Sequence, residues 1–422
     1  MKISPLYFLI FLVFTFQSCT KEINPTKPED SEPIITYAQT IGDGSGNPIY
    51  IGENFTFKNN PYANVDYIIK DWIIILDSTT TIEPGCVIYF EGSHAGMITQ
   101  GNGAIYAQGT SDAPIIFSST EKWAGSWKGI FIGTHRFENV FSYCKFEYAG
   151  NSPIEQMSVP AALGVHQDNN DFLEPVIHVN NCTFDKNNGF AFYCESLNAH
   201  IEDFSFNSVF NQQGAPIGLP FKLASSIASN NTFHTPQKPN TLKYVLLFND
   251  GFNQNSDLDQ DLTLHKLDLP YRFKGSEGVS IVKAGLSIEP GVVLEFDVDG
   301  GLVIKEGFIK AIGTPSEPIV FKGISGSISK WVGISIQTDN SNNILQYCDI
   351  SSAGSKKAAW CDGQGAITLG NWFGINGKAD VSNCRISNSG AYAIDKKNNS
   401  VLTTSNNIYS LNFLSPDIHT YQ

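Results

Sequence analysis

Three carboxylates alternate along one short segment, Asp257-Leu-Asp259-Gln-Asp261. Carboxylate oxygens are the ligands that Ca²⁺ prefers, and alternating side chains can converge on one ion. An EF-hand loop, however, needs glycine at its sixth position, and Leu262 stands there. Two interpretations stay open, a weak calcium site and a solvated acidic loop, and the loop is favoured. No other metal or cofactor is indicated.

A second candidate site combines aromatic and planar polar side chains. Trp360, Trp372 and Phe373 belong to one glycine-rich segment, and Asp362 and Gln364 stand between the two tryptophans. An aromatic face stacks on the apolar face of a sugar ring, while carboxylates and amides bind its hydroxyls. This set predicts a ligand-binding surface for carbohydrate. In the alternative, which is favoured for these rings, they only pack their segment onto the fold.

The charge balance restricts the partners. Lys and Arg number 27 against 41 Asp and Glu, which gives a net charge of −14. Because phosphate recognition needs a basic face, we expect no nucleic-acid partner. The arginines are only Arg136, Arg272 and Arg385, and the guanidinium fork is the group that best clamps a carboxylate. The chain is therefore poorly suited to a uronate polymer.

The N-terminus predicts export and anchoring. Lys2 precedes the apolar run Leu6–Phe16, which is too short to span a bilayer but suits a signal peptide. The following Ser18-Cys19 resembles the lipobox of bacterial lipoproteins, which implies removal of residues 1–18, lipidation of Cys19 and a polar tether over 19–35. Lys21-Glu22 resembles the export signal of Bacteroidetes surface lipoproteins. The resemblance implies an outer-membrane protein facing outward, held to the membrane by its lipid alone; an ordinary secretory signal is the alternative.

An internal repeat organises the rest of the chain. Matching segments recur in the same order at a slowly drifting offset, which indicates duplication of a unit of about 150 residues. The first unit falls within 36–211 and the second within 264–422, with a connecting segment over 212–263. The matches pair Pro61-Tyr62 with Pro270-Tyr271, Ile82–Phe90 with Ile288–Phe296, Ala107–Phe117 with Ala311–Phe321, Trp127–Ile130 with Trp331–Ile334, Tyr143-Cys144 with Tyr347-Cys348, and Asn181-Cys182 with Asn383-Cys384.

Each unit consists of short segments rich in Val, Ile, Phe and Tyr, separated by Gly, Asn, Ser and Pro, and none has sustained helical periodicity. The predicted strands of the first unit are Val87–Phe90, Ile115–Phe117, Gly129–Ile132, Phe141–Phe146, Val176–Val179 and Ile201–Phe206. The series IEPGxxxxF, GT with PI.F, and W.GI resembles the repeat of right-handed parallel β-helices in bacterial surface and pectin-lyase-like proteins. The resemblance implies an all-β solenoid. It says little about activity, because this fold hosts lyases, hydrolases, adhesins and spacers.

Two further features follow from the repeat. After Ala149-Gly150 and after Ala353-Gly354, each unit inserts a segment of about 30 residues that we expect to be irregular and to lie on one face of the solenoid. The pairs Cys144/Cys348 and Cys182/Cys384 are repeat-equivalent and are predicted to be buried free thiols. Disulfides Cys144–Cys182 and Cys348–Cys384 remain the alternative, and no cysteine or histidine spacing indicates zinc.

Three functions are compatible with these patterns. The favoured one is a lipid-anchored, non-catalytic β-helix that binds a polysaccharide or a surface protein through its loops. A divergent polysaccharide lyase or glycoside hydrolase would need a groove with two carboxylates about 5–10 Å apart. A structural spacer or adhesin would need neither feature. The sequence indicates no oligomeric state.

Overall fold

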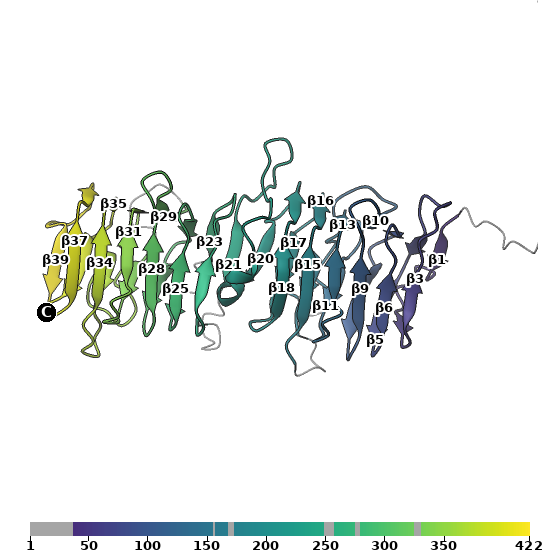
Figure 1. Cartoon of the computed structure of the whole chain (residues 1–422), viewed down its shortest axis with the longest axis horizontal. Helices are drawn as coiled ribbons and strands as arrows, with labels where there is room; N and C mark the ends of the chain where they lie inside the picture. The colour runs from purple at the N-terminus through teal and green to yellow at the C-terminus, as the bar shows by residue number, and fades with distance from the viewer. Residues whose placement is uncertain (1–36, 155–156, 168–172, 249–256, 275–278, 325–330) are drawn as a thin grey trace, which may run out of the picture. The chain divides into compact units, whose positions relative to one another are not determined.

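The computed structural model describes residues 37–154, 157–167, 173–248, 257–274, 279–324 and 331–422. The expected all-β class is confirmed, since these residues form short strands and a single 3-10 helix, η1 (Phe221–Ser226). Every ladder between the strands is parallel, and the strands of successive turns of the chain lie side by side (Figure 1). Residues 36–422 make one compact unit.

Five sheets contain the strands, and three of them occur in the first half of the chain. A 7-stranded sheet contains β1 (Gln39–Ile41), β4 (Tyr67–Ile69), β7 (Val87–Phe90), β10 (Ile115–Ser119), β13 (Cys144–Glu147), β16 (Thr183–Asp185) and β19 (Ser208–Phe210). A 6-stranded sheet, the β3 sheet, contains β3 (Phe55–Phe57), β6 (Thr79–Ile82), β9 (Ala104–Gln108), β12 (Val140–Ser142), β15 (Val176–Asn180) and β18 (His200–Ser205).

A 14-stranded sheet continues through both halves. It contains β2 (Ile49–Ile51), β5 (Trp72–Leu76), β8 (Gly96–Gln100), β11 (Ile130–Ile132), β14 (Ala161–Val165), β17 (Phe190–Cys194), β20 (Ile217–Pro220), β21 (Val245–Phe248), β23 (Tyr271–Phe273), β26 (Val293–Phe296), β29 (Ile319–Gly323), β32 (Cys348–Ser351), β35 (Arg385–Ser387) and β38 (Ile408–Ser410).

Two 6-stranded sheets complete the second half. The β22 sheet contains β22 (Leu262–Leu264), β25 (Gly285–Ile288), β28 (Phe308–Ile312), β31 (Ile344–Gln346), β34 (Lys378–Ser382) and β37 (Val401–Ser405). The β24 sheet contains β24 (Val279–Val282), β27 (Gly301–Ile304), β30 (Gly333–Ile336), β33 (Gly365–Leu369), β36 (Tyr392–Lys397) and β39 (Ile418–Tyr421). Within each half, a strand pairs with the strand three places later, so each turn of the chain, here called a coil, adds one strand to each of three sheets. This arrangement fits a parallel β-helix.

The core lies between the sheets and is built from rows of similar side chains. In-register pairing places Phe117 beside Phe146, and Phe146 beside Phe184, on successive strands. Their rings stack with centroids 5.1 and 4.7 Å apart. Aromatic pairs at such separations add about 0.5–1.5 kcal/mol beyond their area burial. Trp127 and Trp331 also belong to this core, because both are fully buried and stack on phenylalanines.

The corners are sharper than the sequence indicates. Residues 141–146, predicted as one strand, form two strands in different sheets, because Tyr143 adopts φ 49° and turns the chain between them. Asn181 does the same one coil later with φ 52°. Asparagine tolerates the left-handed region, but tyrosine at such an angle is uncommon. The tyrosine corner therefore gives little signal in sequence.

Two buried asparagines make the same contacts in the two halves of the chain. Asn139 and Asn343 are buried before β12 and β31, and each side-chain oxygen accepts the backbone N–H of the preceding coil, from Ile105 and Ile309 respectively. Each amide nitrogen donates to the carbonyl of the following coil, Val176 or Lys378. Two equivalent side chains thus pin three successive coils in the same way.

Tyr271 corrects one of the sequence matches. Its buried hydroxyl donates to the carbonyl of His265 at 2.8 Å. In the first half, the buried side chain of Tyr67 makes the corresponding contact, because its hydroxyl accepts the N–H of Lys58 at 3.0 Å. Tyr62, which the sequence paired with Tyr271, is exposed. The structural counterpart of Tyr271 is therefore Tyr67.

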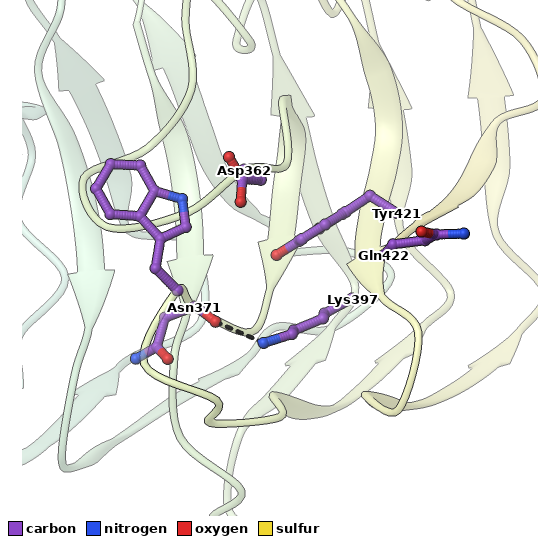
Figure 2. Close-up of a pocket in the computed structure, with 6 residues that line it drawn as sticks. Asp362, Asn371, Lys397, Tyr421 and Gln422 are labelled. Atoms are coloured by element: carbon purple, nitrogen blue, oxygen red, sulfur yellow. Dashed lines mark hydrogen bonds between the residues drawn. The ribbon is translucent and has the colours of Figure 1, made fainter.

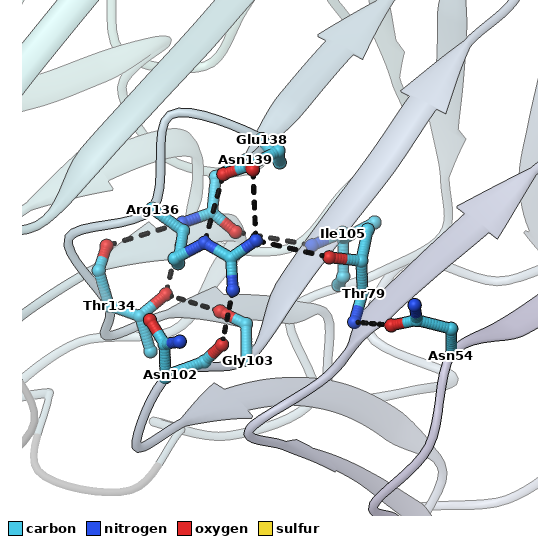
Figure 3. A network of polar contacts seen from close by, with 9 residues as sticks. All are labelled: Asn54, Thr79, Asn102, Gly103, Ile105, Thr134, Arg136, Glu138 and Asn139. Atoms are coloured by element: carbon cyan, nitrogen blue, oxygen red, sulfur yellow. Dashed lines mark hydrogen bonds and ion pairs between the residues drawn. The ribbon is translucent and has the colours of Figure 1, made fainter.

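Arg136 connects neighbouring coils where strands of the β3 sheet begin (Figure 3). Its guanidinium donates to the carbonyl of Asn102 at 2.8 Å and to the hydroxyl of Thr79 at 3.3 Å, and it pairs with Glu138 at 2.9 Å. These partners stand beside the starts of β6, β9 and β12. The backbone N–H of Thr79 in turn donates to Asn54, which extends the network by one coil.

The connecting segment 212–263 belongs to the stack. It supplies β20 and β21 to the 14-stranded sheet, while η1 contacts both β18 and β22 and so joins the β3 sheet to the β22 sheet. Across this junction, strands that are equivalent in sequence lie in different sheets, a difference here called the change of face. Val87–Phe90 lies in the 7-stranded sheet, whereas its sequence equivalent Val293–Phe296 lies in the 14-stranded sheet.

The sequence predicted that the two long inserted segments are irregular, and this prediction is wrong for part of each segment. Each contains a strand, β14 or β33, whose five residues are all buried. A strand covered on both faces shows no alternation, and Ala and Gly weaken its signal further. Before these strands, residues 157–160 lead into the 14-stranded sheet at β14, whereas residues 352–364 lead out of it from β32, so the two segments lie at opposite edges of that sheet. After them, residues 173–175 lead into β15 of the β3 sheet, and residues 370–377 lead into β34 of the β22 sheet.

We expect Asn139→Ala and Asn343→Ala each to lower the free energy of unfolding by about 2–3 kcal/mol, because each removes one side chain and leaves backbone groups of two coils without a partner. Urea unfolding of the variants measures the loss. Asn342→Ala, an exposed neighbour, is the control and should change stability by less than about 0.5 kcal/mol. Equal losses in all three variants would contradict the pinning role.

Candidate functional site

A tight turn after β33 presents the most exposed tryptophan of the predicted surface. The side-chain oxygen of Asn371 accepts the N–H groups of Phe373 and Ile375 at 3.0 and 3.1 Å, which fixes the turn between them. Gly374 supplies the positive φ of 86° that the turn needs. Trp372 stands in this turn with 56% of its surface exposed, so its ring is held out by a rigid backbone.

Beside this turn is a hollow of about 470 Å³, here called the Trp372 hollow, lined by Asp362, Asn371, Trp372, Lys397, Tyr421 and Gln422. Three successive coils contribute to it, through the loops around β33, the end of β36 and the end of β39. Lys397 extends along one side and donates to the carbonyl of Asn371 at 2.9 Å. In the view of Figure 2 the hydroxyl of Tyr421 lies between Asp362 and Lys397.

Tyr421 is the fixed wall of the hollow. Its hydroxyl donates to the carbonyl of Leu369 at 3.0 Å and lies 3.1 Å from the sulfur of Cys361. Burial raises the pKa of the Tyr421 phenol well above its ordinary value, so the group stays protonated at neutral pH. The ring is therefore a neutral apolar surface whose polar end is already satisfied.

The charges around the hollow are mixed. Asp362 is exposed and lies 3.5 Å from the ammonium of Lys357, which is also exposed. Lys397 adds a second ammonium on the other side. A carboxylate, an ammonium, an amide and two aromatic rings around one open hollow can bind a polyhydroxylated, uncharged ligand, with hydroxyls on the polar groups and an apolar ring face on an aromatic ring.

The predicted ligand-binding residues divide into two groups. Trp372 and Asp362 line the hollow, whereas Phe373 is exposed at the tip of the turn. Gln364 is occupied with the fold, since its side chain donates to the carbonyl of Gly354 at 2.9 Å. Trp360 is half-buried, and the ammonium of Lys305 lies over its ring at 5.0 Å.

Sequence reasoning missed Asn371, Lys397 and Tyr421. Lys397 and Tyr421 are 25 and 49 residues beyond Trp372 and reach it only because their coils stack on its coil. No local spacing could indicate them. Asn371 carried a weak signal, since an asparagine before a glycine-containing turn commonly bonds its own backbone.

The three aspartates of the acidic segment have separate partners. Asp257 pairs with Lys283 at 2.8 Å, Asp259 lies 3.7 Å from Lys222, and Asp261 accepts the N–H of Gly285 at 2.7 Å. Within the described ranges, no three His, Cys, Asp or Glu side chains are grouped as a metal site requires. Each aspartate of this segment therefore has a partner of its own within the fold.

The four cysteines of the repeat-equivalent pairs are buried free thiols, as predicted, and so are Cys86, Cys194 and Cys361. Cys144 and Cys182 are neighbours in the ladder, because Lys145 pairs with Thr183, and Cys348 and Cys384 have the same relation. Each of these four sulfurs donates to a backbone carbonyl of the preceding coil at 3.3–3.4 Å. Burial raises the pKa of the Cys144, Cys194 and Cys348 thiols well above the ordinary value.

The predicted lipidation residue Cys19, with the signal peptide and tether, lies outside the described residues. No helix in the described part of the chain has the length and apolarity needed to cross a membrane.

No protein-family model matches this chain, and no curated protein or solved structure is similar enough to match it. The geometry of the site is therefore the basis for a functional proposal.

The buried thiols give a chemical prediction. Because the thiolate is the nucleophile and burial disfavours it, we expect Cys144, Cys194 and Cys348 of the native protein to remain unlabelled by N-ethylmaleimide at mildly alkaline pH. After unfolding in guanidinium chloride all three should be labelled. Peptide mapping by mass spectrometry distinguishes the positions. Labelling of native Cys194 at the rate of a free cysteine would contradict the burial described.

Proposed function

We propose that this protein is a surface carbohydrate-binding lipoprotein without catalytic activity. In this proposal Cys19 carries the lipid that anchors the chain to the outer membrane, facing outward. A right-handed parallel β-helix formed by duplication then holds the Trp372 hollow away from the membrane. The observation that carries the proposal is an exposed tryptophan on a rigid turn, beside a carboxylate and an ammonium in one open hollow.

The distribution of arginine supports an uncharged glycan. Arg136 pairs with Glu138, Arg272 with Glu295, and Arg385 with Asp349. Each guanidinium that could clamp a uronate carboxylate is therefore engaged within the fold. The Trp372 hollow offers Lys397 as its cation, and this side chain already donates to a backbone carbonyl. A neutral polysaccharide needs neither group as a counter-ion.

One observation favours an enzyme as the second candidate. Glu174 and Asp259 line a common hollow with Lys222 and His200, and two carboxylates across one hollow are what glycoside hydrolysis requires. A polysaccharide lyase or glycoside hydrolase would release reducing ends or unsaturated oligosaccharides from its substrate. Assays for both products with the polysaccharides bound by the protein distinguish catalysis from binding.

We expect full-length protein purified in detergent to bind at least one neutral polysaccharide on a glycan array, and Trp372→Ala to weaken that binding at least about tenfold. Loss of one stacked ring at about 1.4 kcal/mol corresponds to this factor. Trp123→Ala is the matched control, because Trp123 is 53% exposed but bonds to Glu121 far from the hollow in sequence. If both variants weaken polysaccharide binding equally, or if neither variant weakens it, the Trp372 hollow is not the binding site.

A further inference from the structure

A second hollow of about 350 Å³, here called the Lys222 hollow, lies at the junction between the two halves. Its lining includes Glu174, His200, Lys222, Leu258, Asp259 and Gln260. Leu258 gives it an apolar floor, while His200, Asp259 and Gln260 are exposed at its rim. The side chain of Lys222 is only 12% exposed, and its ammonium lies 3.7 Å from Asp259. Apolar floor and polar rim are again the features that bind sugars.

The two hollows lie along the same edge of the sheets. Glu174 and His200 stand where β15 and β18 begin, and Gln260 precedes the start of β22. In the Trp372 hollow, Trp372 precedes β34 and Lys397 precedes β37, which belong to the same sheet as β22. Both hollows therefore open where the chain enters the β3 and β22 sheets.

The spacing between the hollows follows from the ladder. The order β22-β25-β28-β31-β34 places four steps between the coil of Gln260 and the coil of Trp372. Neighbouring strands are about 4.8 Å apart, so the separation is roughly 20 Å along the stack. A single sugar cannot cover this distance, but an extended chain of several sugars can.

A second tryptophan ring lies beside the turn of Trp372. Lys305 lies in the corner between β27 and β28, and its ammonium lies over the half-buried ring of Trp360. The backbone N–H of Trp372 donates to the carbonyl of Trp360 at 2.9 Å, so the two tryptophans are held together. Trp360, which does not line the Trp372 hollow, therefore lies next to its turn and extends toward Lys305 of an earlier coil.

We propose that one linear neutral polysaccharide binds along this edge, parallel to the stack, and occupies the Trp372 and Lys222 hollows together. This inference rests on the proposed function and goes further, because it defines the ligand as a polymer and adds a second contact site. Oligosaccharides too short to span both hollows then bind through the Trp372 hollow alone.

The test compares chain lengths on the full-length protein. Xylan, mannan and amylose, each with its oligosaccharides from disaccharide to octasaccharide, serve as probes in calorimetric titrations. For the polysaccharide that binds, we expect affinity per chain to rise at least about tenfold between the shortest bound fragment and the polymer, since a second contact on the same chain is intramolecular. Equal affinities for fragment and polymer would overturn the inference.

Variants separate the two sites. The double variant His200→Ala/Gln260→Ala removes exposed rim groups of the Lys222 hollow and should weaken polymer binding about tenfold while leaving the shortest fragment unaffected. Trp372→Ala should weaken both. The control His94→Ala/Gln213→Ala changes exposed residues at the corner between the 7-stranded and 14-stranded sheets and should alter neither.

The outcomes distinguish this inference from the proposed function. If Trp372→Ala abolishes binding but the His200→Ala/Gln260→Ala variant binds polymer like the native protein, the second contact is wrong and the proposed function stands. If the double variant unfolds, Asn198→Ala at the same rim replaces it. Failure of every probe to bind would overturn both proposals.

Discussion

In-register parallel pairing between successive coils is the constraint on which the rest of this structure depends. Each strand bonds to its neighbours on both sides, so an inward side chain must lie beside the inward side chain of the next coil. Phe117, Phe146 and Phe184 form such a row. A one-residue slip would turn every side chain of a strand to the other face. Extra residues are therefore accommodated at corners, and the corners carry the polar groups.

The junction shows how much freedom this constraint leaves. The 14-stranded sheet continues through it without a break in pairing, yet equivalent strands of the two halves lie in different sheets. Backbone hydrogen bonds do not depend on which repeat position supplies the strand, so a change of face costs no ladder bonds. The change of face produces an irregular corner, where η1 replaces a strand and Lys222 lies in a hollow.

The Trp372 hollow follows from the same logic. Its backbone groups are satisfied locally by Asn371, Lys397 and Tyr421, while the ring of Trp372 and the side chain of Asp362, which pairs with Lys357, are exposed to solvent. Such preorganisation reduces the entropy lost on binding, because the turn is ordered before a ligand arrives. In the proposed binding mode, two hollows along one edge favour an extended ligand over a compact one.

The sequence by itself determined the all-β class and the buried free thiols of the pairs Cys144/Cys348 and Cys182/Cys384, because each follows from residue type and spacing within a coil. It also indicated Trp372 and Asp362. Only the tertiary structure decided the corner at Tyr143, the buried strands β14 and β33, the change of face at the junction, and the approach of Lys397 and Tyr421 to Trp372. These features depend on contacts between coils about 25 residues or more apart, and such contacts leave no periodic signal within any one coil.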